Sequence, residues 1–288
     1  EDNAFYGCDR LRTVVIGDGV ETIGERAFYS CYNLTSLSIG KNVETIGVSA
    51  FNGCSSLEAL NIPNSVTSIS DYAFDGCSNL ITLNIGSAIT SIGYGAFHNC
   101  KSLTSPIDIP NATTIGGSAF QGCSKIPSVT LSEQLKKIEG STFSGCDKLK
   151  TVVIPNNVRS IGTCAFDGCG NLTSVTLGSN VKTIGDCAFR SCKNLTSINL
   201  PDGVTAIGSY AFDGCAKLSS DIIIPSGVKN IEKYTFCNCS SLATVELPDG
   251  LVTIGDYAFQ NCSSLESVEF PEGLERSEER RVGKECRS

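Results

Sequence analysis

The sequence predicts a repeat solenoid, either mixed α/β or mostly β, with one short parallel strand in each coil of about 23 residues. A Phe–x–x–Cys unit occurs twelve times, and every interval is 23 residues except the 24 between Phe212 and Phe236. Three residues after each of these Cys comes Leu, with Ile126 as the one substitute. A 23-residue unit cannot bury its own apolar side, but a stack of about twelve coils can.

The strand is predicted from the stretch after this Leu, such as "LTSLSI" over 34–39. Apolar and polar residues alternate there with period two, as expected for a strand with one buried face. A Pro or Gly, as at Pro63 or Gly86, then ends the strand and turns the chain. The residue before each repeat Cys is Gly, Asn or Ser, which favours a corner with left-handed backbone.

Two units depart from the pattern, at "LTSPIDIP" (103–110) and "LSSDIIIP" (218–225). Each carries one extra residue just before the closing strand residues. After the first insertion the chain has one residue fewer before Ile115, so the 23-residue interval is kept. The second insertion has no such compensation and accounts for the single interval of 24. We expect a loop or bulge to absorb each insertion without disturbing the stack.

We expect residues 1–275 to form one solenoid that is incomplete at both ends. Residues 276–288 ("RSEERRVGKECRS") are highly charged, resemble a translated sequencing adapter and are predicted to be a disordered tail. The longest aliphatic run, Ile222–Ile224, is far shorter than the roughly 18 residues of a membrane helix. A formal net charge of −8 argues against a nucleic-acid surface, so neither nucleic acid nor membrane insertion is expected.

Twelve of the sixteen cysteines occupy one repeat position and should form a column. Parallel side chains in a column do not face each other as a disulfide requires, and a line of thiols does not converge on a metal. The chain has one histidine, His98, which is expected to be a solvated loop residue, so no base serves these thiols. We therefore expect no cofactor, no metal and no catalysis, and interpret the cysteines as core. The predicted core includes Phe28, Cys31, Leu34, Phe51, Cys54, Leu57, Phe166, Cys169 and Leu172.

Cys164 and Cys187 differ, because they share the position before Ala–Phe in neighbouring coils. Other repeats carry Tyr or Ser there, which indicates an exposed position. Two alternatives remain open, a Cys164–Cys187 disulfide and two free surface thiols.

Two surfaces are candidates for ligand binding. The outward positions of the predicted strands form a long, small and mostly neutral polar face, which is either a binding face or simply a soluble one. The tyrosines Tyr210, Tyr234 and Tyr257 share one slot in the last three coils, and binding hot spots favour this residue type. The candidate sheet face comprises Ser36, Ser38, Asn61, Thr82, Asn84, Ser128, Thr130, Thr151, Ser174, Thr176, Ser197, Asn199, Thr244, Glu246, Ser267 and Glu269.

The unit Ile–Gly–x–x–Ala–Phe–x–x–Cys–x–x–Leu–x–x–Leu–x–Ile–Pro–x–x–Val resembles the BspA-type leucine-rich repeat, also called the Treponema pallidum type, over residues 1–275. The resemblance implies a solenoid with a parallel sheet on one side and frequent residence on bacterial or protist surfaces. It also implies a non-catalytic adhesion or protein-binding module of a cell-surface or secreted protein, with a host or matrix protein as its partner. The alternative is an intracellular scaffold, or the sensor arm of a larger multidomain protein.

Overall fold

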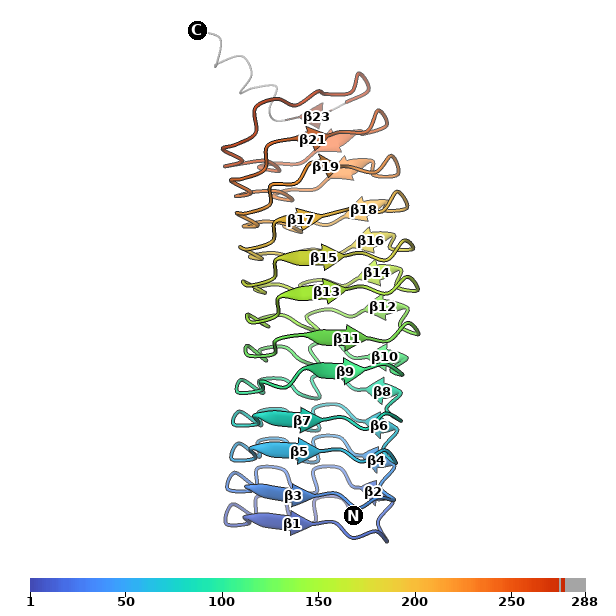
Figure 1. Ribbon diagram of the computed structural model, residues 1–288, viewed down its shortest axis with the longest axis vertical. Coiled ribbons are helices and arrows are strands. Elements are labelled where there is room, and N and C mark those ends of the chain that lie inside the picture. The colour runs from blue at the N-terminus through green and yellow to red at the C-terminus, as the bar shows by residue number, and fades with distance from the viewer. Residues whose placement is uncertain (275, 278–288) are drawn as a thin grey trace.

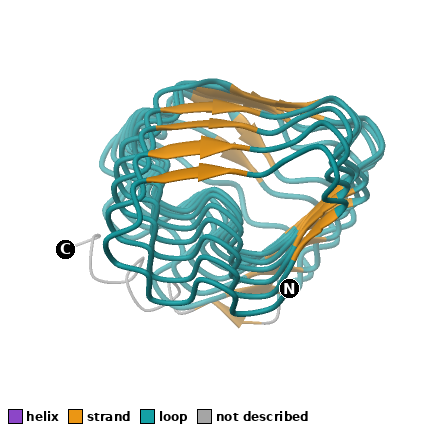
Figure 2. Ribbon diagram, turned by 90° about the horizontal axis from the view of Figure 1, so that it is seen from below, coloured by secondary structure: helices purple, strands orange, loops and turns teal. Residues whose placement is uncertain are grey.

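The computed structural model describes residues 1–274 and 276–277 of the chain. They form one long stack of coils, with the N-terminus in the first coil and the last described residues at the opposite end (Figure 1). Seen along its axis, each coil has a strand on two of its sides and a strand-free turn on the third (Figure 2). The described residues contain no helix, so the mostly-β alternative of the predicted fold class is the correct one.

Each coil contributes two strands rather than the one that the alternation predicts. The predicted strands are β1 (Thr13–Val15), β3 (Ser36–Ser38), β5 (Ala59–Asn61), β7 (Thr82–Asn84), β9 (Ile107–Ile109), β11 (Val129–Leu131), β13 (Thr151–Val153), β15 (Ser174–Thr176), β17 (Ser197–Ile198), β19 (Ile222–Ile223) and β21 (Val245–Glu246). The additional strands are β2 (Thr22–Ile23), β4 (Thr45–Ile46), β6 (Ser68–Ile69), β8 (Ser91–Ile92), β10 (Thr114–Ile115), β12 (Lys137–Ile138), β14 (Ser160–Ile161), β16 (Thr183–Ile184), β18 (Ala206–Ile207), β20 (Asn230–Ile231), β22 (Thr253–Ile254) and β23 (Arg276–Ser277). A two-residue strand is too short to show an alternating pattern.

All strand pairs are parallel and join equivalent positions of successive coils, as in Thr13↔Ser36 and Thr22↔Thr45. The ladder of the additional strands, the even-numbered ones and β23, runs from β2 to β10, from β12 to β18 and from β20 to β23. Each of its two breaks adjoins a coil that carries one of the two insertions. The insertions therefore interrupt hydrogen bonding locally while the stack continues across them.

The core is built from columns of identical residues. The rings of the twelve repeat phenylalanines, Phe5 to Phe259, stack face to face with centroids 5.1–5.7 Å apart and planes within 13°. Nine of these rings are fully buried. The nine Phe, Cys and Leu residues expected in the core are all buried. Stacked aromatic rings add to the hydrophobic contribution of each Phe, which helps to fix one coil on the next.

Two residues of each coil have left-handed backbone. One precedes the repeat Cys, as the sequence predicts, with Gly168 at φ 72° and Asn99 at φ 59°. The other is four residues earlier, before Ala–Phe, and its φ lies between 49° and 60° although it is glycine only at Gly95. The sequence gives no sign of this second corner, because its occupants include Ser, Tyr and Cys, which disfavour such a backbone.

Two residues of the predicted tail lie in a described strand. Arg276 and Ser277 form β23, which pairs with β22 in the register Thr253↔Arg276. The rest of the predicted tail, 278–288, lies outside the described residues. Among the described residues, no helix is long and apolar enough to cross a bilayer.

Two glycines should differ sharply in their tolerance of alanine. A Cβ on Gly168 would approach nothing closer than 3.8 Å, whereas one on Gly185 would lie 2.8 Å from backbone atoms of Gly162 and Thr163 in the preceding coil. We expect Gly168→Ala to lower the free energy of unfolding by about 1 kcal/mol, from the left-handed backbone alone. Gly185→Ala should lower it by about 3 kcal/mol, because backbone in contact cannot move aside. Urea unfolding measures both, and equal losses would contradict close coil contact at Gly185.

Candidate functional site: a sheet face, a tyrosine ridge and a buried thiol ladder

The predicted sheet face is a real surface. Fifteen of its sixteen residues are exposed, and Ser174 is half-buried. Ser128, Asn199 and Thr244 flank strands rather than lying in them. Ser267 and Glu269 lie outside any strand, because the last coil forms no strand equivalent to β21. Asp108 and Asp221 also face outward on this side, but the two insertions shift them out of the pattern that located the other residues.

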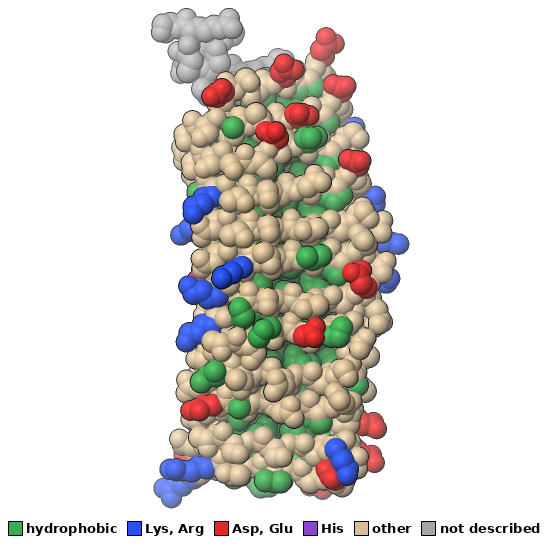
Figure 3. Space-filling model, viewed as in Figure 1, with side chains coloured by type: hydrophobic (Ala, Val, Ile, Leu, Met, Phe, Trp, Pro, Cys, Tyr) green, Lys and Arg blue, Asp and Glu red, His purple; other side chains and the backbone are tan. Residues whose placement is uncertain are grey.

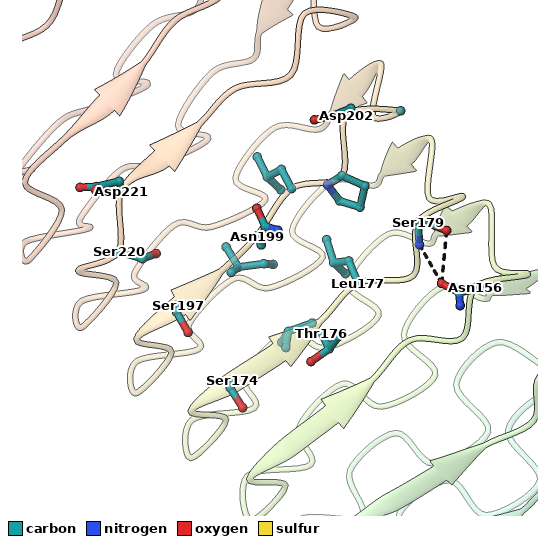
Figure 4. Close-up of a pocket in the computed structure, with 15 residues that line it drawn as sticks. Asn156, Ser174, Thr176, Leu177, Ser179, Ser197, Asn199, Asp202, Ser220 and Asp221 are labelled. Carbon is teal, nitrogen blue, oxygen red and sulfur yellow. Dashed lines mark hydrogen bonds between the residues drawn. The ribbon is translucent and has the colours of Figure 1, made fainter.

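A groove crosses this face next to the second insertion (Figure 4). Its volume is about 730 Å³, and its polar lining includes Thr176, Ser197, Asn199, Asp202 and Asp221. Ser179 donates from both its amide and its hydroxyl to Asn156 Oδ1, at 3.0 and 3.3 Å, at one end of the groove. No Lys, Arg or aromatic residue lines the groove. It therefore offers hydroxyls, amides and two carboxylates beside aliphatic side chains such as Leu177 and Pro201.

The three tyrosines form a continuous stack, which we call the tyrosine ridge (Tyr210, Tyr234 and Tyr257). The ring centroids of Tyr210 and Tyr234 are 4.6 Å apart, and those of Tyr234 and Tyr257 are 4.9 Å apart. Partial desolvation, with the neighbouring tyrosines adding to it, raises the pKa of the Tyr234 phenol. Tyr257 is 55% exposed at the end of the ridge. The ridge follows the second left-handed corner, so its side chains project from a strained backbone.

The repeat cysteines form a hydrogen-bonded ladder rather than an inert apolar column. From Cys31 onward, each Sγ donates to the carbonyl oxygen of the repeat Phe in the preceding coil, for example Cys123 to Phe97 at 3.1 Å. The same carbonyl accepts the amide of Cys100 at 3.2 Å, so its two lone pairs are both used. Bonds of the same kind are made by Cys31, Cys54, Cys77, Cys100, Cys146, Cys169, Cys192, Cys215, Cys239 and Cys262.

Burial makes these thiols hard to ionise. Desolvation raises the pKa of Cys54 from 9.0 to about 12. The same cause raises the pKa of Cys77 and Cys192 well above the ordinary value, since both are completely enclosed. The ladder is therefore unsuited to nucleophilic chemistry, which uses the thiolate.

Cys164 and Cys187 lie at the second left-handed corner and are half-buried free thiols in the structure. Partial burial, opposed by nearby Arg190, raises the pKa of Cys187 to about 11, and a side-chain hydrogen bond with Cys164 contributes. The two thiols are therefore neighbours, and a disulfide between them stays a prediction.

His98 is not a solvated loop residue. Its side chain is 30% exposed, and its Nδ1 lies 2.9 Å from Asp75 Oδ1 in the preceding coil. The same slot pairs Arg190 with Asp167 through two bonds of 3.0 and 2.6 Å. Each pair joins residues 23 apart in the same repeat slot, so the repeat period was the signal in the sequence that could have located it. Within residues 1–274 and 276–277, no group of three His, Cys, Asp or Glu side chains could hold a metal ion.

The thiol ladder predicts loss of stability at alkaline pH. Unfolded cysteines release their protons near pH 9, whereas the buried ones retain them, so the unfolded chain binds fewer protons above that pH. Stability contributed by each buried thiol is complete below pH 9 and falls above it, with a slope approaching about 1.4 kcal/mol per pH unit. We expect urea unfolding under reducing conditions to show a steep decline above pH 9.

The control for this prediction is the double variant Cys100→Ala/Cys192→Ala. Its stability at pH 7 will be lower, but the slope above pH 9 should be shallower by about 3 kcal/mol per pH unit, because two titrating groups are gone. An unchanged slope would mean that other groups cause the alkaline loss.

Comparisons with known proteins agree with this architecture. A family model described as the BspA type leucine rich repeat region matches residues 1–104, 90–219 and 217–281. A leucine-rich repeat protein from Bacteroides ovatus is similar at 28% identity, with a TM-score of 0.66, over 96% of this chain and 82% of that one. A leucine rich cell surface protein from Faecalibacterium prausnitzii is similar at 28% identity, with a TM-score of 0.55, over 91% and 85% of the two chains.

A leucine-rich repeat protein from Eubacterium ventriosum shares the fold at 23% identity, with a TM-score of 0.59, over 94% of this chain and 87% of that one. A comparison with curated proteins gave no match.

Proposed function

Because the chain belongs to the BspA-type leucine-rich repeat proteins, we propose that it is a non-catalytic module that binds a protein ligand through the tyrosine ridge. We further propose that it serves in adhesion on a cell surface or in a secreted protein. The similar protein from Faecalibacterium prausnitzii is described as a cell surface protein, which supports this location. A host or matrix protein is the proposed partner.

The proposal rests on the left-handed backbone conformation of the three tyrosines. Tyr210, Tyr234 and Tyr257 have φ of 58–60°, where a residue with a Cβ is strained by roughly 1 kcal/mol or more relative to glycine. Three successive coils nevertheless place a large aromatic side chain there. Strained residues that face solvent are typical of binding and catalytic sites, and tyrosine is typical of binding hot spots.

The shape of the ridge suits a protein partner. Stacking at 4.6 and 4.9 Å keeps the rings ordered before any partner arrives, so little side-chain entropy is lost on binding. Each phenol carries a hydroxyl at the end of an apolar ring, and can bury area while it donates a hydrogen bond. The outward strand positions of the sheet face include exposed aliphatic side chains such as Val153 and Ile223, but no aromatic ring among the described residues.

The test uses purified matrix proteins as immobilised probes and three variants of this chain. We expect the triple variant Tyr210→Ser/Tyr234→Ser/Tyr257→Ser to lose at least about tenfold in affinity for the protein that binds the parent chain. Ser stands naturally in this slot at Ser49, Ser118 and Ser141, so the fold should tolerate the change.

Tyr72→Ser is the matched control, since Tyr72 occupies the same slot outside the ridge, and it should bind like the parent. Thr176→Lys/Asn199→Lys blocks the groove on the sheet face and should also bind like the parent. If the groove variant lost binding while the tyrosine variant bound fully, the binding site would be the sheet face and the proposed role of the ridge would be wrong.

A further inference from the structure

A third surface feature is independent of the ridge and of the groove. The position just before each even-numbered strand holds Lys136, Arg159 and Lys182 in three successive coils. The Arg159 amide donates to the Lys136 carbonyl and the Lys182 amide to the Arg159 carbonyl, both at 2.8 Å, so the three residues are in register. We call these three residues the basic column. Adjacent strands lie about 4.8 Å apart, so its Cα atoms follow each other at about that interval.

The basic column has no counter-charge among the described residues. All three side chains are exposed, and no carboxylate in residues 1–274 lies within 4.0 Å of their charged groups. The neighbouring Lys137, by contrast, pairs with Glu139 at 2.6 Å. Basic side chains gather along both long edges of the molecule in its middle coils, although the chain as a whole carries −8 (Figure 3).

At the same position, other coils carry a threonine whose hydroxyl forms a hydrogen bond that these three coils lack. In Thr67, Thr90, Thr113 and Thr205 the hydroxyl donates to the carbonyl of the preceding coil, at 3.0–3.4 Å. Lys and Arg cannot reproduce that bond and instead place like charges side by side on adjacent strands, which is destabilising. Three successive losses of stability at one exposed position point to a ligand.

The residues beside the basic column define the ligand further. The turn before it exposes the amide groups of Gln134, Asn157 and Asn180, and half-buried Ser160 and Thr183 follow it. Neutral hydrogen-bonding groups thus flank the cations on both sides, and no aromatic side chain lies among them on which a base could stack. A chain bearing both anionic groups and hydroxyls matches this surface.

We propose that the basic column binds a linear anionic polysaccharide that lies along the long axis of the solenoid. The cations contact its sulfate or carboxylate groups, and the flanking amides and hydroxyls contact its hydroxyl groups. Lys229 continues the same position beyond Thr205 and lengthens the track by two coils. The even-numbered ladder that carries the column is a different side of the coil from the odd-numbered sheet (Figure 2).

Heparin is the probe, with binding followed by titration at several salt concentrations. We expect Lys136→Thr/Arg159→Thr/Lys182→Thr to weaken binding at least about tenfold and to reduce the salt dependence, because three counterion-releasing contacts disappear. Threonine is the residue that neighbouring coils carry at this position, so the variant should fold, and its urea unfolding should show a free energy no lower than that of the parent.

The control variant Lys101→Thr/Lys193→Thr/Lys217→Thr removes the same charge from the turn after the repeat Cys, a different slot of the coil, and should bind within about twofold of the parent. If both variants lost the same affinity for heparin, net charge alone would explain the binding, and the proposal would be wrong. If a poly-glutamate peptide or single-stranded DNA bound more tightly than heparin, the assignment of a polysaccharide ligand would be wrong. The matrix-protein result of the tyrosine variants is unaffected by either outcome, because those variants keep the basic column.

Discussion

Hydrogen bonds between equivalent positions of successive coils set the register of the whole stack, and the bond from each buried thiol to the phenylalanine carbonyl of the preceding coil is their recurrent side-chain member. A carbonyl that already accepts the amide of its own coil has one lone pair left, and a buried lone pair without a donor is destabilising. Cysteine supplies that donor at a size that fits beside the stacked rings. Alanine would fit but leave the carbonyl short of a donor, and a longer polar side chain would overfill the space. This explains why one residue type recurs at that position in coil after coil.

Register converts sequence position into surface chemistry. Because successive coils are stacked in register, side chains 23 residues apart are neighbours. Residues at a variable position can therefore pair with the residue at the same position of the next coil. Asp75 meets His98 and Asp167 meets Arg190 for this reason. The tyrosine ridge and the basic column follow the same rule, with the difference that their members match a partner outside the chain rather than one another.

Much of this architecture could be predicted from the sequence, because columns in the structure are simply repeats in the chain. Burial of Phe51, Cys54 and Leu57 needs only the period and the apolar character of those positions. The second strand was not predictable, since two residues show no alternation. The corner at Tyr210 was not predictable either, because local preference disfavours it and the neighbouring coils impose it. Asp108 and Asp221 reach the sheet face only through insertions whose path the sequence leaves open.

The two proposed binding surfaces share one physical argument. In each, exposed residues stand where another residue would cost less stability, Tyr at a left-handed corner that only glycine occupies without strain and Lys or Arg where Thr would form a bond. A regular stack can tolerate such losses because its stability is spread over many equivalent interfaces. Because the two surfaces use different slots of the coil, a protein and a polysaccharide need not compete for the same residues. Because the core positions of the repeat are fixed by packing, its exposed positions can carry residues suited to different ligands.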